Sequence, residues 1–250
     1  MRFKVGSGQV TVNMASRAQL LAEVGQRWQA GEGFALATLN LDHLAKLARS
    51  GSFRAAYGAQ DLVTADGNPI VWLARLAGRR LDLLPGSDLI VPLAQAAAQA
   101  GLGVALVGGT HQSLAQAAQA LRAAVPGLDI VAQIAPPMGF DPDGAAAGAL
   151  LDGVAASGAR LCFVALGAPK QEMLAARGRT LAPAVGFAGI GAGLDFLAGS
   201  QKRAPRWVRR IAAEWLWRML SDPRRMVGRY SRAALVLPGH AWRAWRGGRQ

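Results

Sequence analysis

The stretch "DLVTADGNPIVW" (residues 61–72) decides the fold class. A short apolar run ends at the pair Asp66-Gly67, and a segment of helical character follows directly behind Asn68 and Pro69. An Asp-Gly pair is typical of a tight turn, and proline is favoured in the first turn of a helix. The stretch therefore predicts a buried strand that turns at once into a helix, as in α/β proteins.

The succession of strand and helix continues along the chain. Apolar runs typical of buried strands occupy residues 34–40, 62–65, 103–108, 128–133, 160–167 and 184–189. Capping residues predict the helix starts between them, at Ser16, Pro69, Ser87-Asp88, Thr110, Asp143 and Pro169. Buried strands that alternate with helices predict a Rossmann-like, mainly parallel sheet with helices on both faces. We expect this α/β domain to span residues 1–198.

Length and composition limit the number of domains and the compartment. A chain of 250 residues with 52% hydrophobic residues fits one large α/β domain with a smaller appendage. The single cysteine, Cys162, lies inside an apolar run, so disulfides within the chain are excluded and a reducing compartment is expected. The first 30 residues contain no continuous apolar segment, which argues against a signal peptide and for a cytoplasmic protein.

The net charge of +13 is concentrated in the C-terminal region. Residues 199–250 hold 13 Lys and Arg against two acids, together with five of the seven tryptophans. Apolar residues at helical spacing, surrounded by arginines, predict a basic amphipathic helical appendage over residues 199–250. Such a segment binds either nucleic acid or an anionic membrane. The amphipathic spacing and the nearly neutral remainder of the chain favour the membrane.

Ligands of parallel sheets bind where strands end and helices begin. The segments at the predicted strand ends are "TLN" (38–40), "ADG" (65–67), "VGGT" (107–110), "LGAPKQE" (166–172) and "GIGAGLD" (189–195). Taken alone, Asp66 is typical of a turn, although a carboxylate at a strand end is also a candidate general base. The segment "GAPKQE" is either an ordinary helix start or an anion or sugar site.

Motifs for nucleoside triphosphates, dinucleotides and metals are weak. "VGGT" lacks the third glycine of a dinucleotide fingerprint and the GK[ST] of a P-loop. "FDPDG" (140–144) has the spacing of a divalent-metal site beneath a nucleotide-sugar diphosphate, but Pro142 and the helix behind it favour a turn and helix cap. The three histidines are scattered without zinc spacing. We therefore expect neither a metal nor another cofactor.

Eight motifs in order resemble the WecG/TagA/CpsF family of bacterial glycosyltransferases. They run from about residue 38 to about residue 230 and read "TLNLDHL", "LVTADGNPIVWLARLAG", "LPGSDLI", "VALVGGT", "GFDPD", "FVALGAPKQE", "GLDFLAG" and "KRAPRWVRRIAAEWLWRMLSDPRR". The resemblance implies an inverting, metal-independent enzyme. Such an enzyme moves a sugar, in several members N-acetylmannosamine from UDP, onto a polyprenyl-diphosphate-linked saccharide, while some relatives transfer glucose.

The resemblance also implies a role for each matched residue. Asp66 would be the base that deprotonates the acceptor hydroxyl, with Thr38 beside it as the second catalytic residue. Gln171 would contact a substrate sugar, and Asp195 would lie near the nucleoside. The expected substrate-binding residues are Asn40, Gly67, Gly86, Asp88, Gly108, Gly109, Gly167, Lys170, Gln171, Asp195, Arg218, Arg224 and Arg225.

The C-terminal appendage would then attach the protein to the inner face of the cell membrane. In the family it contributes arginines to the site, and docking of the appendage would switch activity on. Two positions depart from the family pattern. Leu83 stands where an arginine is expected, a contact that Arg79 or Arg80 could replace, and Leu39 stands where proline is common.

The expected partners are a UDP-sugar donor, a lipid-linked saccharide acceptor and an anionic membrane, but not nucleic acid. A homo-oligomer is also compatible with the sequence. A UDP-glucose-type donor in exopolysaccharide synthesis is the alternative within the same class. The alternatives from other classes are a non-catalytic membrane-binding or nucleic-acid-binding protein. A rise in melting temperature with UDP would separate an enzyme from a non-catalytic membrane scaffold.

Overall fold

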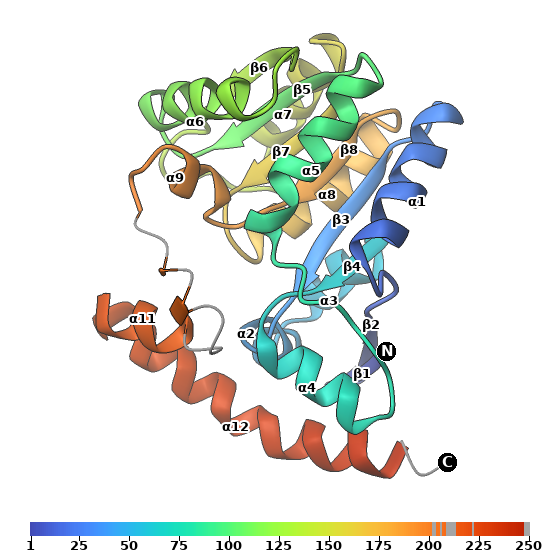
Figure 1. Ribbon diagram of the computed structural model, residues 1–250, viewed down its shortest axis with the longest axis vertical. Coiled ribbons are helices and arrows are strands. Elements are labelled where there is room, and N and C mark those ends of the chain that lie inside the picture. Colours follow the sequence, from blue (N-terminus) through green and yellow to red (C-terminus); the bar gives the residue numbers. More distant parts are fainter. Residues whose placement is uncertain (202–203, 206, 209–213, 222, 248–250) are drawn as a thin grey trace.

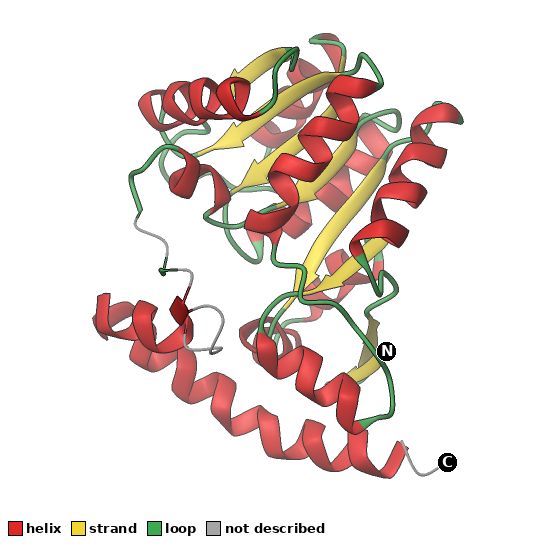
Figure 2. Cartoon of the chain, viewed as in Figure 1, coloured by secondary structure: helices red, strands yellow, loops and turns green. Residues whose placement is uncertain are grey.

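A parallel sheet forms the centre of the molecule in the computed structural model, which describes residues 1–201, 204–205, 207–208, 214–221 and 223–247 (Figures 1 and 2). Its six strands lie in the order β4-β3-β8-β7-β5-β6, and all are parallel. They are β3 (Phe34–Leu39), β4 (Leu62–Ala65), β5 (Gly103–Gly108), β6 (Ile130–Ile134), β7 (Ala159–Ala165) and β8 (Gly186–Gly189). The structure confirms the predicted mainly parallel α/β sheet.

Helices cover both faces of this sheet because successive strand residues point to opposite sides. On one face, Phe34 and Leu36 pack with the apolar sides of α1 (Arg17–Gln29), α5 (Gly86–Gln99), α6 (His111–Ala124) and α9 (Gly193–Leu197). On the other face, Ala35 and Phe187 pack with α7 (Ala145–Ala156) and α8 (Lys170–Leu181). The strands are therefore buried on both sides, which explains why their sequences show no polar alternation.

A third apolar cluster lies at the β4 end of the sheet. It joins the antiparallel hairpin of β1 (Arg2–Val5) and β2 (Gly8–Thr11) to α2 (Leu41–Leu47), α3 (Gly51–Gly58) and α4 (Asn68–Leu76). The chain continues to α11 (Glu214–Ser221) and the long helix α12 (Pro223–Gly247), which packs against α2 and α4 (Figure 1). The sequence predicted the helical character of this C-terminal region but not the hairpin.

Capping chemistry sets the starts of two helices as predicted. The Ser16 hydroxyl accepts a hydrogen bond from the Gln19 backbone N–H, and Thr110 forms a capping box with Ser113. Other boundaries differ from the prediction by one or two residues. Helix α5 begins at Gly86, α7 follows Gly144, and Pro169 precedes α8 as its N-cap.

Two strands also begin later than predicted, each for a local reason. The strand predicted from residue 128 begins at Ile130, because the Leu128 N–H donates to the Val125 carbonyl in a turn. The strand predicted from residue 184 begins at Gly186, because the Val185 N–H donates to the Ala182 carbonyl. In both cases a turn at the end of the preceding helix uses a backbone N–H that the apolar sequence predicts to be part of the sheet.

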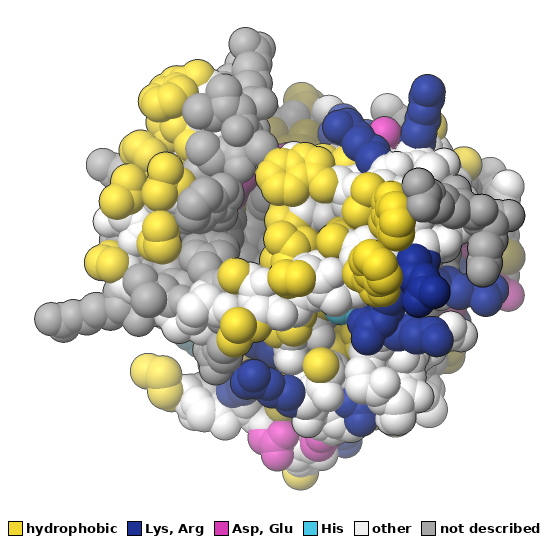
Figure 3. Space-filling model, turned by 90° about the horizontal axis from the view of Figure 1, so that it is seen from below, with side chains coloured by type: hydrophobic (Ala, Val, Ile, Leu, Met, Phe, Trp, Pro, Cys, Tyr) yellow, Lys and Arg dark blue, Asp and Glu magenta, His cyan; other side chains and the backbone are white. Residues whose placement is uncertain are grey.

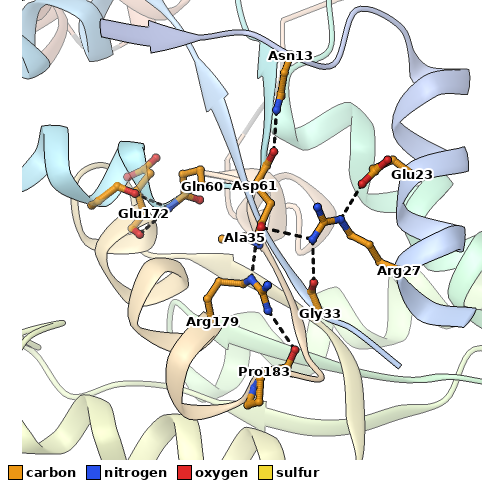
Figure 4. Close-up of polar contacts among 11 residues, drawn as sticks. Asn13, Glu23, Arg27, Gly33, Ala35, Gln60, Asp61, Glu172, Arg179 and Pro183 are labelled. Atoms are coloured by element: carbon orange, nitrogen blue, oxygen red, sulfur yellow. Dashed lines mark hydrogen bonds and ion pairs between the residues drawn. The ribbon is translucent and has the colours of Figure 1, made fainter. Parts of the chain in front are cut away.

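Asp61 joins strands and helices at the amino end of β4 (Figure 4). Its Oδ2 accepts hydrogen bonds from the Ala35 N–H at 2.8 Å and from Nε of Arg179 at 2.7 Å. Its Oδ1 lies 3.4 Å from Arg27, whose Nε pairs with Glu23 at 2.9 Å. One carboxylate thus connects β3, β4, α1 and α8 at the amino ends of the strands.

We expect Asp61→Ala to lower the free energy of unfolding by about 2 kcal/mol, because it removes the side-chain acceptor of the Ala35 N–H and one acceptor from each of two partly buried guanidinium groups. Urea denaturation measures the change. Glu23→Ala is the matched control, since it removes only the outer ion pair and should cost less than about 0.5 kcal/mol. Equal losses in the two variants would contradict the central role of Asp61.

Candidate active site

The carboxyl ends of β3 and β4 bring three predicted site residues together. The two strands pair in parallel, with Thr38 opposite Thr64 and Leu39 opposite Ala65. Asp66 follows β4 directly, and its backbone N–H donates to the Leu39 carbonyl at 2.8 Å. This pairing places the residues that follow both strands at the same edge of the sheet.

The Asp66 carboxylate lies between two donors from the end of β3. Its Oδ2 is 3.2 Å from Nδ2 of Asn40 and 3.5 Å from the Thr38 hydroxyl. Thr38 is buried and Asp66 is half-buried. The two donors stabilise the ionised carboxylate and limit its rotation. This arrangement fits a general base whose orientation is fixed by its neighbours.

Gly67 turns the chain between Asp66 and α4. Its φ of 97° lies in the region that favours glycine, and it occupies the N-cap position of α4. Pro69 follows in the first turn, where its missing N–H is not needed. The strand can therefore end at Asp66 and the helix can begin at Asn68 without an intervening loop.

The start of α8 is connected to the sheet through Gln171. This side chain is only 2% exposed, its Oε1 accepts from the Gly191 N–H at 3.0 Å, and its Nε2 donates to Oε1 of Glu172 at 2.9 Å. The Nζ of Lys170 donates to the Phe140 carbonyl at 2.7 Å. Gly167 precedes this segment with a φ of 69°. The side chains of "GAPKQE" thus make protein contacts that the sequence did not reveal.

Two glycines stand at the end of β5, and the second of them lies beside Asp195. Gly108 has a φ of 127°, and its Cα faces the Ala165 backbone so closely that a Cβ would collide with the Ala165 carbonyl. A Cβ on Gly109 would lie 3.9 Å from Oδ1 of Asp195, whose Oδ2 accepts from Gln201 at 2.9 Å. The end of β5 and the start of α9 therefore form a second group of predicted site residues.

Helix α5 approaches the end of β8 at Gly86. A Cβ there would lie 2.8 Å from Cα of Ile190, so only glycine fits. Asp88 is half-buried in the first turn of α5. The preceding loop is fixed to β4, because the Thr64 hydroxyl donates to the Leu84 carbonyl at 3.0 Å. Leu83, at the position where an arginine was expected, is exposed on this loop.

Three predicted contacts lie outside what the structure describes. Arg218 belongs to α11, and Arg224 and Arg225 belong to α12, but their side chains are not among the described ones. Within the described ranges, no helix is long and apolar enough to cross a membrane. The described residues contain no group of three or more His, Cys, Asp or Glu that could hold a metal ion. In "FDPDG", Oδ1 of Asp141 accepts from the Asp143 N–H at 3.0 Å, as in a turn.

Sequence reasoning missed a set of polar residues behind the site. His43 and Tyr57 are buried behind Asn40, with Nδ1 of His43 2.8 Å from the Tyr57 hydroxyl. Lys46 pairs with Asp42 at 2.9 Å and donates to the Ala168 carbonyl at 3.2 Å. Asn40 stands three residues before His43, which is the spacing of an N-cap side chain and the backbone N–H whose hydrogen bond it accepts. This spacing was the signal in the sequence that could have revealed the group.

Glu172 is an ionisable group buried next to this site. It is 1% exposed, and its Oε2 has no hydrogen-bond partner among the described residues. Burial raises the pKa of Glu172 from 4.5 to about 7, although the Gln171 side chain and Lys46 favour its charged form. Burial, together with the charges of Glu172 and Asp66, also raises the pKa of Tyr57 well above its ordinary value.

This burial predicts a pH dependence of stability. Between the ordinary pKa of 4.5 and the folded value of about 7, the folded protein binds more protons than the unfolded chain. The free energy of unfolding should therefore fall as the pH rises through this window, and by about 3 kcal/mol in total for this group. Urea denaturation at about pH 5 and about pH 8 measures the change, and Glu172→Gln should remove it.

The control for this prediction is Glu23→Gln, which changes a carboxylate that is partly exposed on α1. We expect this variant to keep the pH dependence of the wild-type protein. If Glu172→Gln and the wild-type protein lost the same free energy of unfolding between the two pH values, the buried carboxyl would not be the cause.

Comparison with known protein families identifies the family of the chain. The model of the glycosyl transferase WecG/TagA/CpsF family matches residues 6–250 and thus nearly the whole chain. The match includes β3, β4 and all the strand ends described above. The chain therefore belongs to the WecG/TagA/CpsF family and is a glycosyltransferase of cell-surface polysaccharide synthesis.

Proposed function

We propose that the protein is an inverting, metal-independent glycosyltransferase that uses a UDP-sugar, of the UDP-N-acetylmannosamine type. The acceptor is a saccharide linked to polyprenyl diphosphate at the inner face of the cell membrane. The observation that carries the proposal is the Asp66 carboxylate, held by Asn40 at 3.2 Å and Thr38 at 3.5 Å where two parallel strands end.

Asp66 acts as the base in the proposed reaction. It takes the proton of an acceptor hydroxyl while the hydroxyl oxygen attacks the anomeric carbon of the donor sugar. The bond between this carbon and the UDP oxygen breaks, so that the sugar leaves its nucleotide with inversion of configuration. Thr38 and Asn40 hold the carboxylate toward the acceptor during this step.

The departing diphosphate needs positive charge or N–H donors if no metal neutralises it. The start of α6 supports such a role, because the positive φ values of Gly108 and Gly109 turn the chain sharply from β5 into the N-terminus of this helix, which Thr110 caps. Asp195 beside Gly109 is placed near the nucleoside in this proposal. Arg218, Arg224 and Arg225 would supply further positive charge when the C-terminal region docks.

The remaining predicted contacts have secondary roles in this proposal. Gln171 would hold Gly191 and thereby the segment after β8, since its amide is already bonded there. Lys170 would reach a substrate only after its bond to the Phe140 carbonyl opens. Gly86 and Asp88 would border the donor at the start of α5, and Gly167 would give the chain its turn before α8.

A transfer assay tests the base. We expect Asp66→Asn to lower kcat for sugar transfer by roughly a hundredfold to ten-thousandfold, because the amide cannot accept the proton. The assay offers UDP-N-acetylmannosamine or UDP-glucose to a polyprenyl-diphosphate-linked sugar in detergent micelles. EDTA should leave the wild-type rate unchanged, and NMR of the product should show the inverted anomer.

Asp152→Asn is the matched control, because Asp152 is an exposed carboxylate on α7, outside the predicted site. Its transfer rate should equal that of the wild-type protein. An Asp66→Asn variant with the wild-type rate would exclude Asp66 as the base. Complete loss of transfer in EDTA would instead show that a metal ion is necessary, with Asp141 and Asp143 as its candidate ligands.

A further inference from the structure

Helices α4 and α12 present an exposed face that the proposed chemistry does not use. Its apolar side chains are Trp72 and Leu76 on α4, 50% and 43% exposed, and Trp242 and Trp245 on α12, 57% and 38% exposed. We call these residues, together with the exposed Arg75, Arg79, Arg243 and Arg246, the α4–α12 face. Figure 3 shows hydrophobic and basic side chains gathered on this side of the molecule.

The opposite side of α12 holds the helix in place. Ala244 is buried in the same apolar cluster as Val71 and Leu73 of α4, and Leu237 and Ala241 pack against that cluster. These α12 residues follow helical spacing, which leaves Trp242 and Trp245 on the outer side. The two indole rings lie 5.3 Å apart, and the Arg246 guanidinium lies 5.6 Å from the Trp242 ring.

The charge on this face is almost entirely positive. Residues 68–83 and 234–247 contain five arginines and one acid, Asp82. Indole rings beside arginines suit the boundary between lipid headgroups and acyl chains. A second copy of the chain would set these arginines against one another across a two-fold axis. Nucleic acid would leave Leu76 without an apolar partner.

We propose that the α4–α12 face docks on an anionic lipid bilayer, so that α4 of the α/β sheet region binds the membrane together with the C-terminal helix. This proposal rests on the proposed function, because docking serves catalysis only if the acceptor is a lipid-linked sugar. Trp72 lies in α4, six residues after Asp66. Docking through α4 would hold the base within reach of a sugar attached to a lipid diphosphate.

A fluorescent probe at residue 72 tests this docking directly. The only native cysteine, Cys162, is fully buried, so Trp72→Cys provides the one accessible thiol for an environment-sensitive label. We expect the emission to shift to the blue with vesicles of equal parts phosphatidylglycerol and phosphatidylcholine. Leu181→Cys is the control on α8, where Leu181 is 44% exposed, and its label should not respond.

Vesicle sedimentation of the full chain gives a second measurement. We expect Arg75→Glu to weaken binding to the anionic vesicles by at least about fivefold, the worth of one basic residue near such a surface. Leu76→Glu should also weaken binding, whereas Leu181→Glu should not. Docking is overturned if residue 72 stays silent while the chain sediments, if phosphatidylcholine alone binds equally, or if only nucleic acid shifts the label. No sugar substrate is present, so these outcomes are independent of the transferase proposal.

A separate observation concerns the polar chain behind Asp66. The Tyr57 hydroxyl donates its proton to the Thr38 carbonyl at 2.9 Å. Toward His43, whose Nδ1 lies 2.8 Å away, the hydroxyl can therefore only accept a hydrogen bond. In the neutral imidazole Nε2 is then the acceptor, and it lies 3.4 Å from Nδ2 of Asn40. The orientation of the Asn40 amide agrees, because its Oδ1 accepts the His43 N–H at 2.9 Å.

From this chain we infer that His43 and Tyr57 are positioning residues for Asp66. Tyr57 fixes the tautomer of His43, and His43 turns the Asn40 amide so that its Nδ2 faces both the imidazole and the carboxylate. This inference rests on the proposed role of Asp66. Neither His43 nor Tyr57 touches a substrate, since both are buried behind Asn40.

Kinetics of Tyr57→Phe test this inference. We expect kcat to fall about fivefold to tenfold, the worth of one hydrogen bond, at an unchanged KM for the donor. The acidic limb of the pH–rate profile should move to higher pH. Phe53→Leu is the control, because Phe53 contacts the same imidazole edge-on, with ring centroids 5.9 Å apart, and makes no hydrogen bond to it.

The Phe53→Leu profile should keep its wild-type position, even if the variant is less stable. A Tyr57→Phe enzyme that lost only stability and kept the wild-type pH profile would overturn the positioning role. A wild-type rate for Asp66→Asn would instead refute the proposed base, so the two failures can be told apart.

Discussion

The pairing of β3 with β4 is the constraint on which the rest of the site depends. Parallel strands end at the same edge of a sheet, so Asn40 and Asp66, which are 26 positions apart in the chain and separated by α2 and α3, meet there. The hydrogen bond from the Asp66 N–H to the Leu39 carbonyl extends this pairing by one residue beyond β4. A slip of the register would separate Asp66 from Thr38 and Asn40 and turn every side chain of β4 to the other face.

Much of the fold could be predicted because its signals are local. Buried strands read as apolar runs, and serine or threonine caps mark helix starts, as Ser16 and Thr110 do. The hairpin of β1 and β2 was missed although "RFKV" alternates polar and apolar residues, because two strands of four residues each are a weak signal beside the longer apolar runs. The exact starts of β6 and β8 depend on turns that use their first N–H groups, which composition does not show.

The site was predictable as far as strand ends locate it. Thr38, Asn40 and Asp66 lie together as expected, because topology alone brings them to one edge. The contacts of Gln171 and Lys170 could not be predicted, since Gly191 and Phe140 reach them from distant parts of the chain. The link from His43 to Tyr57 joins two helices and depends on how α2 packs on α3.

The Asp61 cluster lies at the amino end of β4, and the proposed chemistry lies at the opposite edge of the sheet. Cohesion and reactivity therefore occupy separate ends of the same strands. In most enzymes, mutations that add rigidity carry a risk of slowing turnover. Here the length of the strands separates the Asp61 cluster from the proposed site. Substitutions at the amino ends of the strands can therefore change the heat resistance of the protein while the sugar chemistry is left untouched.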